Sequence, residues 1–231
     1  MIEALNLTKK FNSKTVLDNL NIKVLSGEIF CLLGQNGAGK TTTINLFLGF
    51  IKPDGGKALI DNIDVNTSSN LSKAAIAYIP EIVQLYGNLT GLENLDFFSR
   101  LAGFKYSQNE LANLLDKTGL LRSAHTKPLS TYSKGMRQKV GIAIAISKNA
   151  KAIFMDEPTS GLDPKATAEF TAICKELAAS GKSIFMATHD IFNAVNVGSR
   201  IGIMREGNLV HHTYTQDVNA NELKKLYLKT I

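Results

Sequence analysis

The chain carries the stretch Gly34-Gln35-Asn36-Gly37-Ala38-Gly39-Lys40-Thr41-Thr42, which matches the pattern G-x-x-x-x-G-K-[ST] at every fixed position. An apolar run at 29–33 precedes it, and a helix-like segment at 42–50 follows it. This order of strand, glycine-rich loop and helix is the one that the pattern requires. Its three glycines let the backbone curl so that several N–H groups point at phosphate oxygens. The stretch therefore predicts a binding site for a nucleoside triphosphate rather than a chance glycine turn.

The side chains of this loop are expected to hold a nucleotide and its metal ion. Lys40 should reach the β- and γ-phosphates, and the hydroxyl of Thr41 should bind Mg²⁺. The helix that follows adds the positive end of its dipole. The expected nucleotide contacts in this stretch are Gly34, Asn36, Gly37, Ala38, Gly39, Lys40, Thr41 and Thr42.

The composition is that of an ordinary globular protein. The chain has 231 residues, of which 44% are hydrophobic and 20% charged, and its net charge is +6. Its lysines and arginines are scattered, so the charge suits solubility and a nucleotide site, and we expect no nucleic-acid partner. No apolar run approaches the roughly 18 residues of a membrane span, and the first residues lack the blocks of a signal peptide, so we expect a cytoplasmic location. Cys31 and Cys174 are expected to be reduced packing residues.

Both ends of the chain alternate strand-like and helix-like segments. Residues 2–8 and 20–25 alternate apolar and polar side chains, which favours an antiparallel edge sheet. Apolar runs at 152–155 and 183–187 flank a helix-like segment at 165–179, and such a strand–helix–strand unit implies a parallel sheet. The expected fold is α/β: a P-loop NTPase core, with a mostly parallel sheet flanked by helices, and an antiparallel edge sheet.

Between these ends the apolar period becomes helical. Leucine and phenylalanine recur at three-residue steps from Leu92 to Leu101. Residues 86–147 are therefore expected to form an α-helical subdomain, inserted into a single domain whose core is 1–85 and 148–231.

Two adjacent carboxylates follow the apolar run at 152–155. Asp156 fits the acid that holds Mg²⁺ in phosphate-loop enzymes, directly or through water. Glu157 suits a general base that polarises the attacking water. On their own, the two residues would fit a surface turn after a strand equally well.

Ser133 and Gly135 head a helix-like segment at 136–146 and form a second candidate anion site at a helix start. A single nucleotide already has the helix after Lys40, so a second site is useful if it closes over the γ-phosphate held by another copy of the chain. The alternative is an ordinary helix N-cap. His189 follows the run at 183–187 and would lie at the carboxyl edge of the sheet, where it could hydrogen-bond the γ-phosphate.

Together these residues resemble the ATP-binding cassette (ABC) family, the ATPase subunits of ABC transporters. The resemblance covers nearly the whole chain in order: phosphate loop, Q-loop, signature, Walker B acid, D-loop at 160–163 and switch histidine. It implies that Phe11 stacks on adenine, whereas taken alone this residue could equally be core. It also implies an ATPase in which two copies, or one copy and a related cassette, face head to tail around ATP and Mg²⁺. A separate integral-membrane permease is the implied partner, with the chain on the inner face of the cell membrane.

Two segments depart from the family pattern. The signature reads Tyr132-Ser133-Lys134-Gly135-Met136, so Lys134 and Met136 replace a glycine and a glutamine. Glu81 stands where the family has glutamine, and Gln84, three residues on, is the alternative to it. The expected metal ligands are therefore Thr41, Asp156 and either Glu81 or Gln84.

The same resemblance favours export over import, because the chain ends soon after His189 and leaves no room for the regulatory domain of many importer cassettes. One rival function is a soluble ABC-type ATPase in DNA repair or translation, which would need tandem cassettes or sustained heptads. Another is a small-molecule kinase, which would leave Ser133–Met136 and His189 unexplained. His211 and His212 would point to opposite faces of a strand and suit a shared metal poorly.

Overall fold

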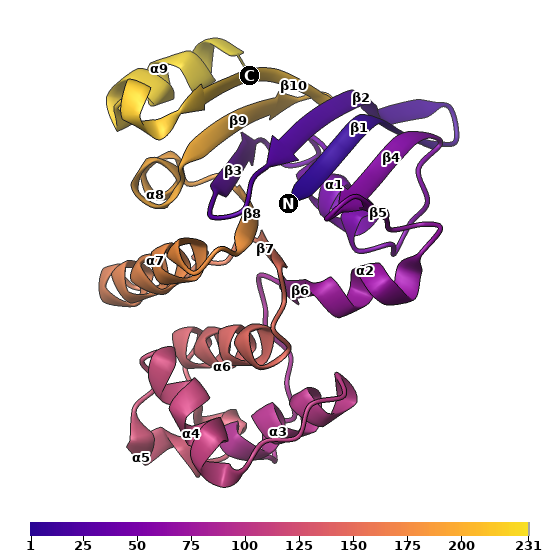
Figure 1. Ribbon diagram of the computed structural model, residues 1–231. Helices are drawn as coiled ribbons and strands as arrows, with labels where there is room; N and C mark the ends of the chain where they lie inside the picture. The colour runs from indigo at the N-terminus through magenta and orange to yellow at the C-terminus, as the bar shows by residue number, and fades with distance from the viewer. Residues whose placement is uncertain (231) are drawn as a thin grey trace.

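The computed structural model describes residues 1–230, which form two β-sheets with helices packed around them (Figure 1). The larger sheet has the strand order β10-β9-β3-β8-β7-β6, and the smaller has the order β2-β1-β4-β5. The strands are β1 (Ile2–Phe11), β2 (Lys14–Val24), β3 (Ile29–Gly34), β4 (Gly55–Ile60), β5 (Ile63–Asp64), β6 (Ile76–Ile79), β7 (Ala152–Asp156), β8 (Ser183–Thr188), β9 (Arg200–Arg205) and β10 (Asn208–Tyr214). The helices are α1 (Lys40–Phe47), α2 (Ser69–Ala75), α3 (Gly91–Leu101), α4 (Gln108–Lys117), α5 (Arg122–His125), α6 (Lys134–Ser147), α7 (Pro164–Ala179), α8 (Ile191–Val197) and α9 (Ala220–Thr230).

The pairing of the strands confirms the expected α/β fold. From β9 through β3, β8 and β7 to β6 all neighbours pair in parallel, and β10 adds an antiparallel edge to β9. The smaller sheet is antiparallel throughout. β2 begins at Lys14, earlier than the strand expected at 20–25, because it forms one long hairpin with β1.

The central strand β3 is buried on both faces, as its uninterrupted apolar sequence requires. Phe30 and Leu32 face a core shared with α1 and the smaller sheet, while Cys31 and Leu33 face a second core shared with α7 and α8. Neighbouring side chains on a strand point to opposite faces, so one short segment joins both cores. The phosphate-loop stretch is thereby attached to a strand that is packed in both cores.

Helices α3–α6 lie together at one end of the molecule, drawn in magenta in Figure 1, around their own hydrophobic cluster. Thr90 and Ser107 begin α3 and α4 with capping boxes, each completed by a glutamate three residues later. Helix α6 belongs to two clusters: Val140 and Ala143 pack with α3–α5, whereas Ile142 and Ala145 pack against the larger sheet. The division of the chain into a core and an inserted subdomain at 86–147 remains a prediction.

Within residues 1–230, the length and apolarity of every helix fall short of what a membrane crossing requires.

Candidate functional site

The loop between β3 and α1 has a conformation that its glycines make accessible. Gly39, at the N-cap of α1, has φ of 113°, a region that side chains rarely adopt. A Cβ atom there would lie 2.8 Å from the side chain of Leu17 and 3.0 Å from the carbonyl oxygen of Val16. The loop therefore packs directly against β2, and only glycine fits at this position. The helix begins at Lys40 rather than at the expected Thr42.

Lys40 lies inside this loop with its side chain almost fully buried. Its Nζ atom donates to the carbonyl oxygens of Gly34 at 2.6 Å and Gln35 at 3.2 Å. Glu157 Oε1 lies 3.9 Å from the same nitrogen. Burial lowers the pKa of Lys40, and the nearby carboxylates of Glu157 and Asp156 oppose that shift. The loop thus presents a cation at its centre, where a phosphate group would replace the carbonyl partners.

Thr41 and Asp156 lie close together although 115 positions separate them in the sequence. Thr41 is in the first turn of α1, after the phosphate loop, and Asp156 is the last residue of β7, which ends beside the start of α1. Thr41 Oγ1 donates to Asp156 Oδ2 at 3.0 Å. Burial raises the pKa of Asp156, and the charge of Glu157 raises it further against the lowering effect of the Thr41 hydrogen bond. Both groups offer the hard oxygen ligands that Mg²⁺ prefers, and a cation would relieve the cost of burying this carboxylate. The residues present therefore fit a magnesium ion.

Glu157 and His189 form a second contact at the carboxyl edge of the sheet. Strands β7 and β8 are neighbours, with Asp156 opposite Ala187, so the residues that follow each strand lie side by side. The backbone N–H of Glu157 donates to the carbonyl oxygen of Ala187 at 2.9 Å. Glu157 Oε2 lies 2.9 Å from His189 Nδ1 and accepts the backbone N–H of His189 at 3.2 Å. The carboxylate is therefore fixed in orientation, while the histidine ring is largely open to solvent.

The phosphate loop, Asp156 and Glu157 line one cavity of about 480 Å³, whereas His189 lines a neighbouring cavity that shares Glu157. Most of the residues expected at the nucleotide line the first cavity, and Phe11 stands at its rim with a half-exposed ring. Of the two alternatives for the third metal ligand, Glu81 lines this cavity, whereas Gln84 is exposed outside its lining. The complete lining is Phe11, Lys14, Val16, Gln35, Asn36, Gly37, Gly39, Lys40, Thr41, Thr42, Glu81, Asp156 and Glu157.

Lys14 and Val16 are site residues that the sequence reading missed. Lys14 pairs directly with Phe11 across the β1–β2 hairpin, so an aromatic residue at the cavity rim brings a lysine with it. The sequence signal for them is the Asn12-Ser13 pair, which suits a tight turn. A two-residue turn at this pair makes Phe11 and Lys14 cross-strand partners, so it predicts that Lys14 lies beside Phe11.

Ser133 and Gly135 lie away from the phosphate loop, in a separate groove of about 220 Å³ beside α7. Ser133 caps α6, its Oγ accepting the N–H of Met136 at 3.3 Å. Gly135 packs closely against Ala166 and Leu162, so a side chain at this position would fill the contact between α6 and α7. The structure therefore does not bring these two residues to the phosphate loop of their own subunit.

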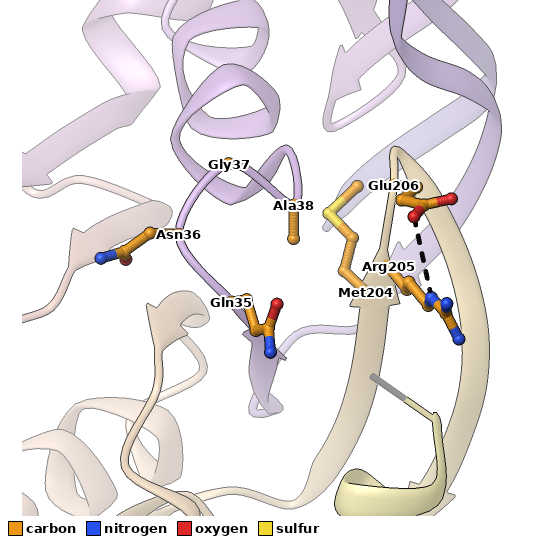
Figure 2. A pocket seen from close by; sticks show the side chains of 7 residues that line it. All are labelled: Gln35, Asn36, Gly37, Ala38, Met204, Arg205 and Glu206. Atoms are coloured by element: carbon orange, nitrogen blue, oxygen red, sulfur yellow. Dashed lines mark ion pairs between the residues drawn. The ribbon is translucent and has the colours of Figure 1, made fainter.

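A smaller cavity of about 170 Å³ lies between the phosphate loop and the end of β9. Figure 2 shows the loop from Gln35 to Ala38 facing Met204, with Arg205 and Glu206 at the neighbouring turn. Met204 is fully buried, and a Cβ atom on Gly34 would lie 2.7 Å from its carbonyl oxygen. The end of β9 therefore packs closely against the start of the loop.

The remaining candidates for chemistry lie elsewhere. His211 is half-buried and His212 exposed on β10, in the alternation expected of strand neighbours. Cys31 and Cys174 are both buried free thiols, as expected of packing residues. Burial raises the pKa of Cys31 from 9.0 to about 12, and burial is also the main cause that raises the pKa of Cys174.

We expect both cysteines to be unreactive in the folded protein. A rise of three pKa units lowers the thiolate fraction of Cys31 at pH 8 by about a thousandfold, and the missing solvent access slows the reaction further. Titration with a chromogenic disulfide reagent should therefore detect almost no thiol before denaturation and two thiols after it. A fast-reacting thiol in the native protein would contradict the packing shown here. Since the folded pKa is raised, thiolate formation in the unfolded chain should lower stability above about pH 9.

Comparison with known proteins gives consistent matches along the chain. A family model described as ABC transporter matches residues 17–160. The chain is 34% identical to the probable multidrug ABC transporter ATP-binding protein YbhF of Escherichia coli (strain K12), over 95% of this chain and 38% of that protein. It is also 34% identical to the bacitracin transport ATP-binding protein BcrA of Enterococcus faecalis, over 97% of this chain and 71% of that protein.

Solved structures agree with the sequence matches. An ATP binding subunit of an ABC transporter is similar with a TM-score of 0.87 and 28% identity, over 99% of this chain and 98% of that one. A dimeric ATP-binding cassette bound to ADP and Pi is similar with a TM-score of 0.82 and 27% identity, over 93% of this chain and 99% of that one. The family model covers more than half of the chain, and the relatives align along nearly all of it. This chain therefore belongs to the ABC transporter family and is an ATPase cassette of that family.

Proposed function

We propose that this chain is the ATP-binding and ATP-hydrolysing subunit of a transporter and drives export through a separate integral-membrane permease. The observation that carries the proposal is the cavity lined by the phosphate loop, Asp156 and Glu157, together with the contact of Glu157 with His189, which lines a neighbouring cavity. A phosphate loop alone would serve many kinds of nucleotide-binding protein. A fixed carboxylate beside the expected γ-phosphate position adds what hydrolysis requires, namely an acceptor for the proton of the attacking water.

Each residue of the cavity has a role in this proposal. Phe11 stacks on the adenine ring, and the backbone N–H groups of the phosphate loop bind the phosphate oxygens. Lys40 contacts the β- and γ-phosphates. Thr41, Asp156 and Glu81 would hold Mg²⁺, which when bound neutralises part of the charge on the phosphates.

Glu157 and His189 act at the reacting end of the nucleotide. Glu157 accepts a proton from the water that attacks the γ-phosphorus, which breaks the bond to the bridging oxygen and leaves ADP and inorganic phosphate. His189 contacts Glu157 through Nδ1 at 2.9 Å and, in this proposal, hydrogen-bonds the γ-phosphate through its other ring nitrogen. The largely exposed ring leaves that second nitrogen free to meet a ligand.

A second copy of the chain completes the site in this proposal. Ser133 and Gly135 start a helix but lie in a groove apart from their own phosphate loop. A helix start binds anions well, so these residues suit a nucleotide that belongs to another subunit. Head-to-tail pairing of two cassettes would bring each start of α6 to the partner's nucleotide. The similarity to a dimeric cassette supports this arrangement.

The names of the relatives support a role in drug or antibiotic transport, which suits export, and the proposed permease implies a place at the inner face of the cell membrane. These relatives include a probable multidrug transporter protein and a bacitracin transport protein. The chain spans 38% of the length of the first of these relatives. The partner and the direction of transport proposed for this chain are therefore inferred from its similarity to the ATPase cassette of that relative alone. A soluble ATPase of DNA repair or translation is not favoured, because the matched family is that of transporters.

A pull-down tests the proposed partner. Tagged Glu157→Gln protein would be recovered from detergent-solubilised membranes of its source cells in the presence of Mg-ATP, and mass spectrometry would identify the proteins bound to it. We expect a polytopic membrane protein, whose topology would give the direction of transport. Recovery of soluble proteins or nucleic acid in place of a membrane protein would refute the transporter assignment while leaving the ATPase assignment standing. Lys40→Ala protein serves as the control that should not retain ATP.

A further inference from the structure

Three side chains from distant parts of the chain meet at one carboxylate oxygen. Ser160 Oγ donates to Glu81 Oε1 at 2.9 Å, and Lys134 Nζ lies 3.9 Å from the same oxygen. Glu81 follows β6, Lys134 is the first residue of α6, and Ser160 lies in the turn after β7. A single carboxylate at the nucleotide cavity therefore connects the turn after β7 with the helix start that bears Ser133.

The charge of Glu81 is a difficulty for a site that has to accept a triphosphate. The charged groups lining the cavity are two lysines and three carboxylates, namely Lys14, Lys40, Glu81, Asp156 and Glu157. Glu81 and Asp156 line the same cavity, so the charge of Glu81 acts on the expected metal site. An incoming nucleotide would meet more negative than positive charge unless a further cation lies nearby.

Lys134 is that cation. Its ammonium group lies outside the cavity lining but beside the carboxylate that faces the cavity. Two opposite charges a few ångströms apart act on a third, more distant charge mainly as a dipole, and the repulsion from the carboxylate is largely cancelled. The Ser160 hydrogen bond keeps the carboxylate oriented toward this lysine.

We propose that Lys134 is a positioning residue for nucleotide binding in its own subunit, acting through Glu81. It orients the carboxylate and compensates its charge, which allows a glutamate to stand beside a triphosphate. This inference rests on the proposed nucleotide site. It differs from a role in which Lys134 touches the partner's nucleotide directly, because the effect requires Glu81 and is present in a monomer.

A double-mutant cycle separates these roles. The affinity for ATP would be measured by calorimetric titration without Mg²⁺, at protein concentrations where light scattering shows a monomer. We expect Lys134→Met to weaken binding about two- to fivefold, as fits a partly exposed ion pair. In the Glu81→Gln background the same substitution should have almost no effect, since the charge to be compensated is gone. Raising the salt concentration should shrink the loss seen in the single variant.

Two controls make the outcome decisive. Lys175→Met removes the same charge from an exposed position on α7 and should leave the affinity unchanged. Lys40→Ala tests the nucleotide site itself. If this variant bound ATP as tightly as the wild type, the proposed nucleotide site would be wrong, regardless of the result of the double-mutant cycle. Equal weakening by Lys134→Met in both backgrounds, or no weakening in the monomer, would overturn the role of Lys134 alone. Circular dichroism of each variant would establish that it is folded.

Discussion

Substitution of Glu157 by glutamine should leave ATP binding intact and lower the rate of hydrolysis by about 10²- to 10⁴-fold, the usual contribution of a positioned general base. Glutamine has nearly the same shape and can still accept the backbone N–H of His189, which Glu157 accepts at 3.2 Å. It cannot take up a proton from water. Glu157 also has a positive φ of 45°, and glutamine faces the same backbone cost as glutamate there, so the substitution tests chemistry rather than folding.

The rate would be measured as phosphate release, and the assembly as the elution volume on size exclusion with and without Mg-ATP. Because ATP is consumed very slowly, we expect this variant to elute as a dimer with ATP and as a monomer without it. Glu176→Gln, at an exposed position on α7, is the matched control and should hydrolyse ATP at the wild-type rate. Wild-type turnover by Glu157→Gln would show that another group serves as the base.

Substitution of Lys40 by alanine should remove tight ATP binding. The ammonium group is buried and lies within hydrogen-bond reach of two loop carbonyls, so in the bound state it would make its charge-assisted bonds to phosphate in a water-poor environment. Loss of hydrogen bonds to charged groups costs about 1.5–3 kcal/mol each, which corresponds to at least a tenfold weaker affinity and to more than a hundredfold if two are lost.

Thermal unfolding with and without Mg-ATP checks this expectation. A ligand present at a hundred times its Kd stabilises the folded state by about 2.7 kcal/mol, and at the same ATP concentration this gain should fall to about 1.4 kcal/mol if the affinity is tenfold weaker and to about 0.4 kcal/mol if it is a hundredfold weaker. Without nucleotide the two proteins should melt at similar temperatures. Alanine favours helix at the first position of α1. The substitution also removes the cost of burying the ammonium group together with its hydrogen bonds to the loop carbonyls, and these two effects oppose each other. Lys175→Ala is the matched control and should keep the full gain. An unchanged gain in Lys40→Ala would place the nucleotide elsewhere.

The parts of the site that the sequence predicts well are those encoded by local chemistry. The phosphate loop is one continuous stretch whose glycines dictate its backbone, and Asp156 with Glu157 follows an apolar run that could only be a buried strand. Helix α1 begins two residues earlier than the sequence predicts, because Gly39 serves as its N-cap through a left-handed backbone and offers no side-chain signal.

The parts that escaped prediction depend on pairing between distant segments. Whether Glu81 or Gln84 reaches the cavity depends on where β6 ends relative to β7. The hydrogen bond from Ser160 to Glu81 joins residues 79 positions apart, so no local sequence pattern predicts it. Lys14 and Val16 enter the cavity through the register of the β1–β2 hairpin, which contains several irregularities along its length. Such strand registers are set by the packing of the whole sheet, so they cannot be predicted from the local sequence of one strand.

Helix α6 lies between two hydrophobic clusters and has apolar side chains in each. A helix packed on both sides cannot swing freely about a hinge, because close-packed interiors resist gradual deformation. Helices α3–α5 can change position relative to the large sheet only if side chains slide past one another along one face of α6. Such a movement is a shear with discrete resting positions, since interlocked side chains fit only in certain registers. If the sliding face is the one against the large sheet, α6 would move with α3–α5, and the helix start that bears Ser133 would shift in discrete steps.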